Sequence, residues 1–367
     1  MKSVYKVFLL ILLASPYSFA THVRGGEIMA THVSGQNYQI KVRLYFDLAV
    51  GEGAATAQSN VLVCFGDGST KEFQRTKAER IPGNVLVSDY DGMHTYPSSG
   101  QFQISVSLEN RTPGILNFPD SGDTKAFFWT VINTQVSNST PVLPYLVFEG
   151  GVRQLFKIDL KATVADVDSF TVKLPKLSKP SPGECGVRML EHGYMYPNEV
   201  SSKGTFKVIP NVNQLVWQAP EVLGNYIFAM VVSEWRDGII ISESYREGLI
   251  TVIDKPGPTV EIPPYESAEN GGLITSTPNV KSAEVSMAIV AYPVPTESFV
   301  TVKAYSKKRS IVTLQLIDSK GRVLREIKSG SPVISVQEEF DLRNLAKGLY
   351  IIKASNEVDA VSQKVIR

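Results

Sequence analysis

Aspartate and histidine side chains, the residue types most used for acid–base chemistry, occur close together in the first third of the sequence. Asp67 stands in the run Phe65-Gly66-Asp67-Gly68-Ser69, and His94 precedes Thr95-Tyr96. An Asp between two glycines is typical of a tight turn, where its carboxylate accepts backbone N–H groups. A His at the entry of a strand is expected to pack and to hydrogen-bond backbone. We therefore interpret both residues as structural rather than catalytic.

Metal-ligating residue types occur in two further places. His22 and His32 flank the first predicted strand, but a zinc site needs more ligands than these two. Asp166, Asp168 and Asp237 form a candidate calcium group, although calcium takes about six to eight oxygen ligands and these residues supply few. The alternative is a polar loop that caps one end of a sandwich. We expect no bound cofactor, with calcium left open at these three residues.

Two tryptophans could stack on sugar rings. Trp217 ends an apolar strand and is expected in the core, whereas Trp235 precedes the turn-like run Arg236-Asp237-Gly238 and is the candidate ligand contact. The sequence contains no Gly-x-Ser-x-Gly elbow and no His-Glu-x-x-His zinc motif. We therefore expect no enzyme, although facing carboxylates of a glycosidase can be brought together by a fold and are not visible in sequence.

The two cysteines, Cys64 and Cys185, are too few for a disulfide framework or a four-cysteine zinc site. They fall in different predicted domains. The expectation is two separate buried thiols, because free Cys is usually buried. A single bridge in an oxidising compartment stays open as the alternative.

Composition limits the class of protein. The formal net charge is +1, so no overall field favours nucleic acid or an anionic membrane, and we expect no nucleic-acid partner. Short runs that alternate apolar and polar residues recur between Gly- and Pro-containing turns, and no long stretch shows a helical apolar stripe. These patterns predict an all-β chain made of tandem immunoglobulin-like β-sandwich modules with a small C-terminal β-sandwich.

The boundaries of these modules follow from changes in composition. Lys2 and Lys6 precede a short apolar run that ends in Ser18-Phe19-Ala20, which is typical of an export signal cut after Ala20, and we expect no transmembrane helix. A polar, Pro-containing stretch near residue 138 separates two strand-rich regions, and a Pro- and Gly-rich stretch follows them. The predicted divisions are a signal peptide at 1–20, sandwiches at 21–137 and 138–254, a linker at 255–287 and a C-terminal module at 288–367.

The C-terminal module carries a set of short motifs in a fixed order. Tyr292-Pro293-Val294-Pro295 is followed by Asp318-Ser319-Lys320-Gly321-Arg322, by Gly348-Leu349-Tyr350 and by the terminal Lys364-Val365-Ile366. This order resembles the C-terminal sorting domain of type IX secretion cargo in the Bacteroidetes, which usually has Asn where Val294 stands. The motif residues are Tyr292, Pro293, Pro295, Asp318, Gly321, Gly348, Tyr350 and Lys364.

The resemblance implies that type IX secretion machinery is the partner of this module. It implies export through the periplasm and across the outer membrane, with removal of the module and then release or attachment to surface lipopolysaccharide. The expected location is therefore secreted or cell-surface.

The two larger modules resemble families of extracellular sandwiches. The run at 65–69 together with His94-Thr95-Tyr96 looks like the paired motifs of a PKD-type immunoglobulin-like domain, although Val63-Cys64 replaces the usual preceding pair. The start at 21–28 is similar to the opening of large Bacteroidetes surface proteins. Four runs occur in one order that resembles cadherin-like or immunoglobulin-like repeats: Asp166–Phe170, Gln214–Pro220, Gly224–Phe228 and Glu234–Gly238.

These features together predict a non-catalytic exported surface or secreted protein whose modules mediate adhesion or other extracellular binding. The ligand, whether glycan or protein, is not indicated by the sequence. The alternatives are a carbohydrate-binding accessory protein and a secreted hydrolase.

Overall fold

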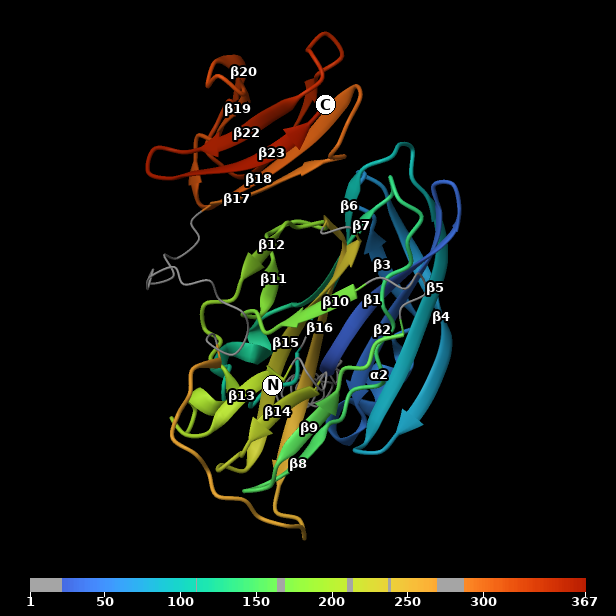
Figure 1. Cartoon of the computed structure of the whole chain (residues 1–367), viewed down its shortest axis with the longest axis vertical. Helices are drawn as coiled ribbons and strands as arrows, with labels where there is room; N and C mark the ends of the chain where they lie inside the picture. The colour runs from blue at the N-terminus through green and yellow to red at the C-terminus, as the bar shows by residue number, and fades with distance from the viewer. Residues whose placement is uncertain (1–21, 110, 164–168, 210–213, 237–238, 269–286) are drawn as a thin grey trace, which may run out of the picture.

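The fold is built almost entirely of β-strands, as the alternating pattern predicts. A body formed by residues 22–268 carries a C-terminal sandwich, residues 287–367, at one end (Figure 1). The predicted class, all-β with sandwich modules and a small C-terminal sandwich, is confirmed. The computed structural model describes residues 22–109, 111–163, 169–209, 214–236, 239–268 and 287–367.

An eleven-stranded sheet forms the framework of the body, and part of it closes into a ring. The neighbours around the ring are β1, β2, β5, β4, β3, β6, β7 and β16, and β16 also pairs with β1. Outside the ring, β15 pairs with β16, β10 pairs with β15, and β8 runs parallel to β16. The strands are β1 (Val23–Ser34), β2 (Asn37–Asp47), β3 (Asn60–Cys64), β4 (Thr70–Ile81), β5 (Val85–Thr95), β6 (Gln101–Leu108), β7 (Ala126–Asn133), β8 (Glu149–Gly151), β10 (Ser169–Lys173), β15 (Gly224–Arg236) and β16 (Ile239–Ile253).

The ring closes where β1 and β16 approach each other most tightly. Gly25 lies opposite Gly248, and Gly26 lies opposite Glu247. A Cβ atom on Gly25 would lie 2.2 Å from the backbone oxygen of Glu247, and Gly25 has a φ of 156°. Only a residue without a side chain fits there, so Gly25 is a condition of closure.

Smaller elements cover the framework. A three-stranded sheet has the order β13-β14-β9, and a two-stranded hairpin pairs β11 with β12. A short helix follows β2, and the Asp47 carboxylate caps it by accepting the N–H of Ala49 at 2.8 Å. The bounds are β9 (Phe156–Asp159), β11 (Ser178–Pro180), β12 (Arg188–Leu190), β13 (Thr205–Ile209), β14 (Gln214–Gln218), α2 (Leu48–Ala57) and the 3-10 turns η1 (Pro119–Asp123) and η2 (Pro197–Glu199).

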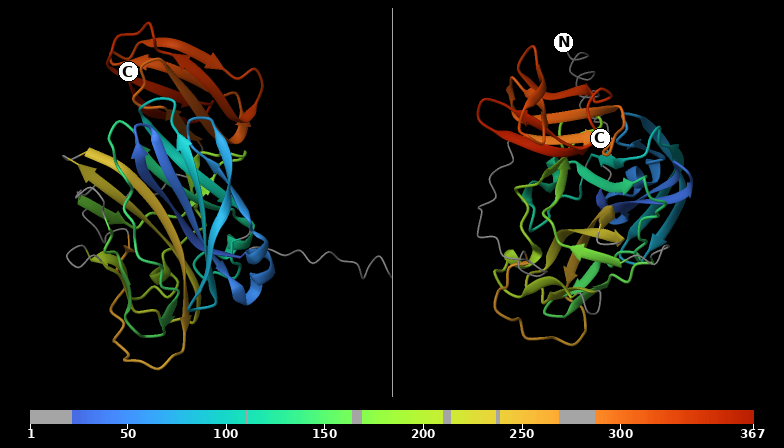
Figure 2. Two further views of the ribbon diagram at one scale, coloured as in Figure 1. Left: turned by 90° about the vertical axis from the view of Figure 1, so that its right-hand side faces the viewer. Right: turned by 45° about the horizontal axis from the view of Figure 1, so that its top comes forward.

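The C-terminal sandwich consists of two sheets that pack face to face, as Figure 2 shows from two further directions. One sheet has the order β17-β18-β21 and the other has the order β20-β19-β22-β23. Apolar side chains from both sheets form a separate core, including Val300, Leu314, Phe340 and Ile352. The strands are β17 (Met287–Tyr292), β18 (Phe299–Ser310), β19 (Thr313–Asp318), β20 (Val323–Lys328), β21 (Val333–Asp341), β22 (Leu349–Ser355) and β23 (Ala360–Ile366).

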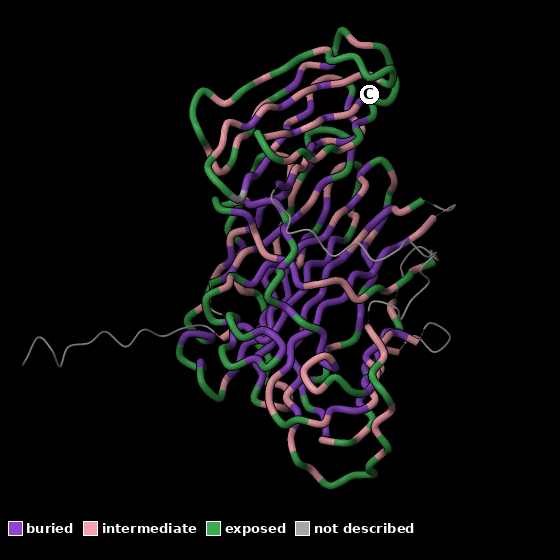
Figure 3. The backbone as a smooth tube through the Cα atoms, turned by 90° about the vertical axis from the view of Figure 1, so that its left-hand side faces the viewer, coloured by how far each residue is buried: buried purple, intermediate pink, exposed green. Residues whose placement is uncertain are grey.

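A single hydrophobic core runs through the body, and Figure 3 shows the buried backbone concentrated there. Phe46 and Phe128 from the first half pack in the same cluster as Phe156 and Phe228 from the second half. Trp217 belongs to this core, as predicted. The sequence suggests a boundary near residue 138, yet backbone pairing crosses it, because β16 lies between β7 and β15.

The expected linker also lies partly against the body. Between residues 255 and 268 the chain is extended and hydrogen-bonded to the body: Val260 donates to the Arg153 carbonyl at 2.8 Å, and Gly204 donates to the Pro263 carbonyl at 2.9 Å. Ala268 is buried in the body core. The rest of the predicted linker, up to residue 286, lies outside the described residues.

Charged side chains are buried inside the body and pair with one another. Arg43 from β2 donates two hydrogen bonds to the Asp89 carboxylate of β5, at 2.8 and 2.9 Å. Burial alone would lower the pKa of Arg43, but its bonds to Asp89 and the charge of Glu27 outweigh this and raise it. Glu27 of β1 also lies 3.2 Å from Arg246 of β16. The network therefore links strands from both halves of the body.

A second buried pair joins Arg111 to Glu247 of β16, and each of the two side chains is 1% exposed. The Tyr245 hydroxyl donates to the Glu247 carboxylate at 2.9 Å, and Arg111 also donates to the Ser178 carbonyl at 3.1 Å. Burial raises the pKa of the Glu247 carboxyl, while Arg111 and Tyr245 act in the opposite direction. The cation is thus needed to keep a charged carboxylate in this core.

We expect Arg111→Met to lower the free energy of unfolding by about 3–5 kcal/mol, because it leaves the Glu247 charge buried without a cation. Adding Glu247→Leu to Arg111→Met should restore part of that loss. Urea denaturation of both single variants and the double variant measures the coupling. Lys125→Ala, which breaks an exposed pair with Glu109, is the matched control and should change stability little. Additive losses in the double variant would contradict this role.

Candidate functional site

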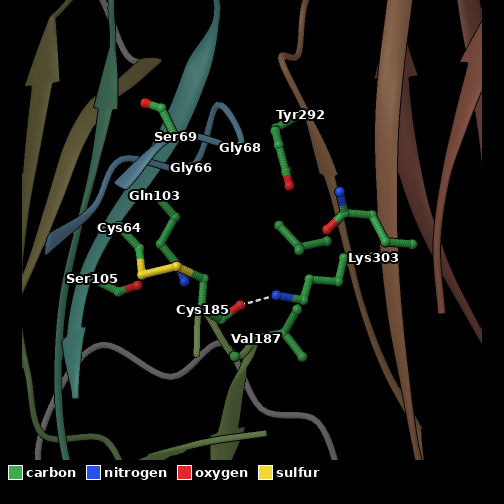
Figure 4. A pocket seen from close by; sticks show the side chains of 13 residues that line it. Cys64, Gly66, Gly68, Ser69, Gln103, Ser105, Cys185, Val187, Tyr292 and Lys303 are labelled. Carbon is green, nitrogen blue, oxygen red and sulfur yellow. Dashed lines mark hydrogen bonds between the residues drawn. A yellow bond between two sulfur atoms is a disulfide. The ribbon is translucent and has the colours of Figure 1, made fainter. Parts of the chain in front are cut away.

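A cleft lies where the C-terminal sandwich meets the body, and both parts line it (Figure 4). On the body side it is bordered by the turn after β3 and by the loop between β11 and β12. On the other side it is bordered by β17, β18 and β21. The lining residues used below are Cys64, Cys185, Val187, Val290, Tyr292 and Lys303.

A disulfide joins Cys64 to Cys185 beside this cleft, across 121 positions of sequence. The two Cα atoms are 5.9 Å apart. The expectation of two separate thiols is therefore wrong. Sequence could not show the pairing because Cys64 ends β3 in the first half, whereas Cys185 lies in the loop of the β11–β12 hairpin in the second half. Packing of the two halves into one body brings them together.

Apolar side chains from both parts meet beside the disulfide. Val187 and Met189 of the hairpin form one buried cluster with Ala288 of β17 and Tyr305 of β18, and Val290 packs against it. A polar contact lies next to this cluster, where the Lys303 ammonium donates to the Cys185 carbonyl oxygen. Burial lowers the pKa of Lys303.

The first of the C-terminal motifs, Tyr292-Pro293-Val294-Pro295, lies on the same contact face. The N–H of Gln101 in β6 donates to the Val294 carbonyl at 2.7 Å. Pro293 and Pro295 pack on Gly100, where a Cβ atom would lie 2.7 Å from Cβ of Pro293 and 3.1 Å from the Pro295 oxygen. The Tyr292 side chain points into the cleft (Figure 4), and burial, with a smaller effect of the Asp67 charge, raises its pKa.

The remaining motif residues form turns and strand ends away from the body. Asp318 accepts the N–H groups of Lys320 and Arg322, both at 2.9 Å, in the β19–β20 turn, and Gly321 has a φ of 82° there. Gly348 exchanges two backbone hydrogen bonds with Arg367, at 3.1 and 3.0 Å. Asp318 and Gly321 therefore shape the turn between β19 and β20.

Two more motif residues follow in the closing strands. The Tyr350 hydroxyl donates to the Ala346 carbonyl at 2.6 Å and the side chain is nearly buried. Lys364 lies in β23 opposite Ile351 and is exposed. The motif residues therefore fall into two groups. Some contact the body, and the others lie in turns and strands of the sandwich away from the body.

His94 and Asp67 are brought together, but in a structural arrangement. The His94 ring stacks on Phe65 with centroids 3.8 Å apart, and its Nε2 lies 2.8 Å from Asp67. Asp67 also accepts the N–H of Ser69 at 2.9 Å, so its predicted turn role is confirmed. Burial would raise the pKa of Asp67, but the bonds from His94 and Ser69 outweigh it and hold the pKa below its usual value.

The candidate metal ligands lie in separate parts of the chain. Asp166, Asp168 and Asp237 lie outside the described residues. His32 bonds the Gly35 carbonyl at 3.0 Å through Nε2. Across the described ranges, no three His, Cys, Asp or Glu side chains are arranged to hold a metal ion.

Trp235 lies near the end of β15, and its side chain is half-buried. Its Nε1 donates to the Thr171 hydroxyl of β10 at 3.0 Å. The indole is therefore held against the β10 strand, which is the last in the order of the large sheet. The residue is therefore partly exposed at this edge of the sheet.

Comparison with known proteins identifies a family for the C-terminal sandwich. Residues 290–367 match the family described as secretion system C-terminal sorting domain. This match supports export of the chain to the cell surface or the medium through a type IX-like secretion signal. We call residues 287–367 the sorting tail from here on. The expected signal peptide, with its cut after Ala20, lies outside the described residues.

Two further comparisons concern the whole chain. No curated protein matches the chain. Among solved structures, the chain resembles one described as "Biofilm associated protein - BSP domain", with 6% identity and a TM-score of 0.18, covering 100% of this chain and 69% of that one. No helix in the described part of the chain is long and apolar enough to cross a bilayer.

We expect the double variant Cys64→Ser/Cys185→Ser to lose about 2–4 kcal/mol of unfolding free energy, because the bridge closes a long loop in the unfolded chain. Urea denaturation without reductant measures this loss. Dithiothreitol should lower the midpoint of the wild type and leave that of the variant unchanged. Equal stability of the oxidised wild type and the variant would show that the bridge contributes nothing.

Proposed function

We propose that this chain is a non-catalytic exported protein whose β-sandwich body binds a ligand outside the cell, at the surface or after release. The observation that carries the proposal is the sorting-domain match of residues 290–367 on a tail that forms a sandwich with its own core. The machinery of a type IX-like secretion system would be the partner of this tail.

The chemistry of the body supports binding rather than catalysis. Its buried carboxylates Glu27, Asp89 and Glu247 pair with buried arginines, which is how a core accommodates charge. A general acid or base must instead reach a substrate in an open site. These groups are therefore assigned to stability, and the ligand contact to the surface of the sandwich.

Deleting residues 287–367 should retain the protein in the periplasm, because the export machinery then has no sorting tail to recognise. Cell fractionation and surface protease digestion in a host with a type IX system measure this. Full-length Trp235→Ala, which leaves the tail intact, is the control and should reach the surface. Surface delivery of the deleted protein would overturn the proposed export route.

The position of Trp235 favours carbohydrate as one class of ligand. A half-buried indole held by Thr171 offers a rigid apolar face at low entropic cost, which suits stacking on a sugar ring. The second candidate function is therefore that of a carbohydrate-binding accessory protein.

If the ligand is a glycan, Trp235→Ala should weaken binding by about tenfold or more, as loss of an aromatic anchor does. A glycan array followed by calorimetry on the identified sugar measures this. Trp235→Phe should keep much of the affinity, and Met93→Ala, which alters another exposed apolar side chain, should have no effect. Unchanged affinity of Trp235→Ala would place the ligand elsewhere.

A further inference from the structure

We propose that the β11–β12 hairpin is a docking platform for this chain's own sorting tail, and that the Cys64–Cys185 disulfide sets how firmly the tail is held. The inference concerns contacts within the chain and does not depend on the proposed export or ligand.

The platform presents both apolar side chains and a backbone carbonyl oxygen to complementary groups of the tail. Val187 and Met189 are 3% and 9% exposed because Ala288 and Tyr305 cover them, and the tail residues Val290 and Ile334 extend this apolar contact. The ammonium of Lys303 donates to the Cys185 carbonyl beside it. A partly buried ammonium that donates to a carbonyl oxygen adds a directional hydrogen bond to an otherwise apolar contact.

The base of the hairpin is well anchored in the body. Three groups bond Ser178 at the start of β11: Trp129 Nε1 at 3.1 Å, Arg111 at 3.1 Å and the Tyr245 hydroxyl at 3.0 Å. These contacts hold the end of the hairpin that lies away from the tail.

The tail contacts the tip of the hairpin. The tip has fewer contacts with the body than the base has. Each strand has three residues, and a two-stranded hairpin is marginal by itself. Within the tip, the N–H of Val187 donates to Ser181 Oγ at 2.9 Å and the N–H of Ser181 donates to the Val187 carbonyl at 2.8 Å. The disulfide adds a covalent tie from Cys185 to Cys64 at the end of β3 (Figure 4).

In this geometry the disulfide determines whether the hairpin tip is held in the position that the tail contacts. Cys185 supplies both the sulfur that fixes the tip and the carbonyl that receives Lys303, and Val187 is two residues further along. Reduction frees the tip to move, so Val187 and the Cys185 carbonyl no longer stay in the positions that fit β17 and β18. The contact of Val294 with Gln101 is independent of the hairpin, and we expect it to tether the tail loosely after reduction.

The test is oxidative footprinting of the full-length protein with mass spectrometry. Tyr305 reports the tail side of the contact, Met189 reports the platform, and Met230, which is fully buried in the body core, reports global unfolding. Reduction of the wild type, and the variant Cys64→Ser/Cys185→Ser, should raise labelling of Tyr305 and Met189 several-fold while Met230 stays protected. The double variant should then be insensitive to dithiothreitol.

A second variant keeps the test decisive if the double serine variant fails to fold. Val187→Asp leaves the bridge intact but puts a charge into the apolar contact, and it should raise Tyr305 labelling in the oxidised protein. Thr31→Ala, on an exposed part of β1, is the matched control and should leave Tyr305 protected. Continued protection of Tyr305 in both the reduced wild type and Val187→Asp would overturn the proposal.

Discussion

The structure of the body depends on where β16 lies. This strand pairs with β15, β7, β1 and β8, so it connects the first half of the chain to the second. Adjacent residues Arg246 and Glu247 point to opposite faces of the sheet, and both are buried and paired, with Glu27 and Arg111. If β16 shifted its register by one residue, Arg246 and Glu247 would exchange faces of the sheet. Each charge would then lie away from its partner, Glu27 or Arg111. We interpret the buried ion pairs as favouring this register over one shifted by a residue.

The features that the sequence could predict are the local ones, and the pairing of β16 is not local. The alternating patterns at 299–304 and 349–354 identify strands β18 and β22 because the period of a strand is a local property. The Asp318–Gly321 turn follows from the backbone freedom of glycine. Partners of strands are not local, so the pairing of β16 with β1, more than two hundred residues away, has no counterpart in the pattern. Helix α2 was not predicted because its ten residues carry no apolar stripe.

The candidate site likewise combines local features that the sequence predicts with contacts that it does not. The Tyr292-Pro293-Val294-Pro295 motif could be found from sequence, but its contact with Gly100 and Gln101 of the body could not, since nothing local marks those two residues as its partners. Cys64 and Cys185 were visible as an isolated pair in a chain with an expected export signal, and that context was the available signal for a bridge. Lys303 and Val187 carry no pattern of their own, because their importance arises only from the surface opposite them.

Chain connectivity implies an order in which these features form. The local turns and hairpins of the tail can form early, whereas the β1–β16 pairing closes a loop of most of the body and carries a larger entropic cost. Cys64 and Cys185 approach each other only when strands of both halves have packed. The disulfide is therefore expected to form after the body has closed. The tip of the hairpin is then fixed, and the tail finds Val187 and the Cys185 carbonyl in place. Tail docking at the hairpin is thereby expected to follow folding and oxidation of the body, since without the bridge the tip is not held in the position that β17 and β18 contact.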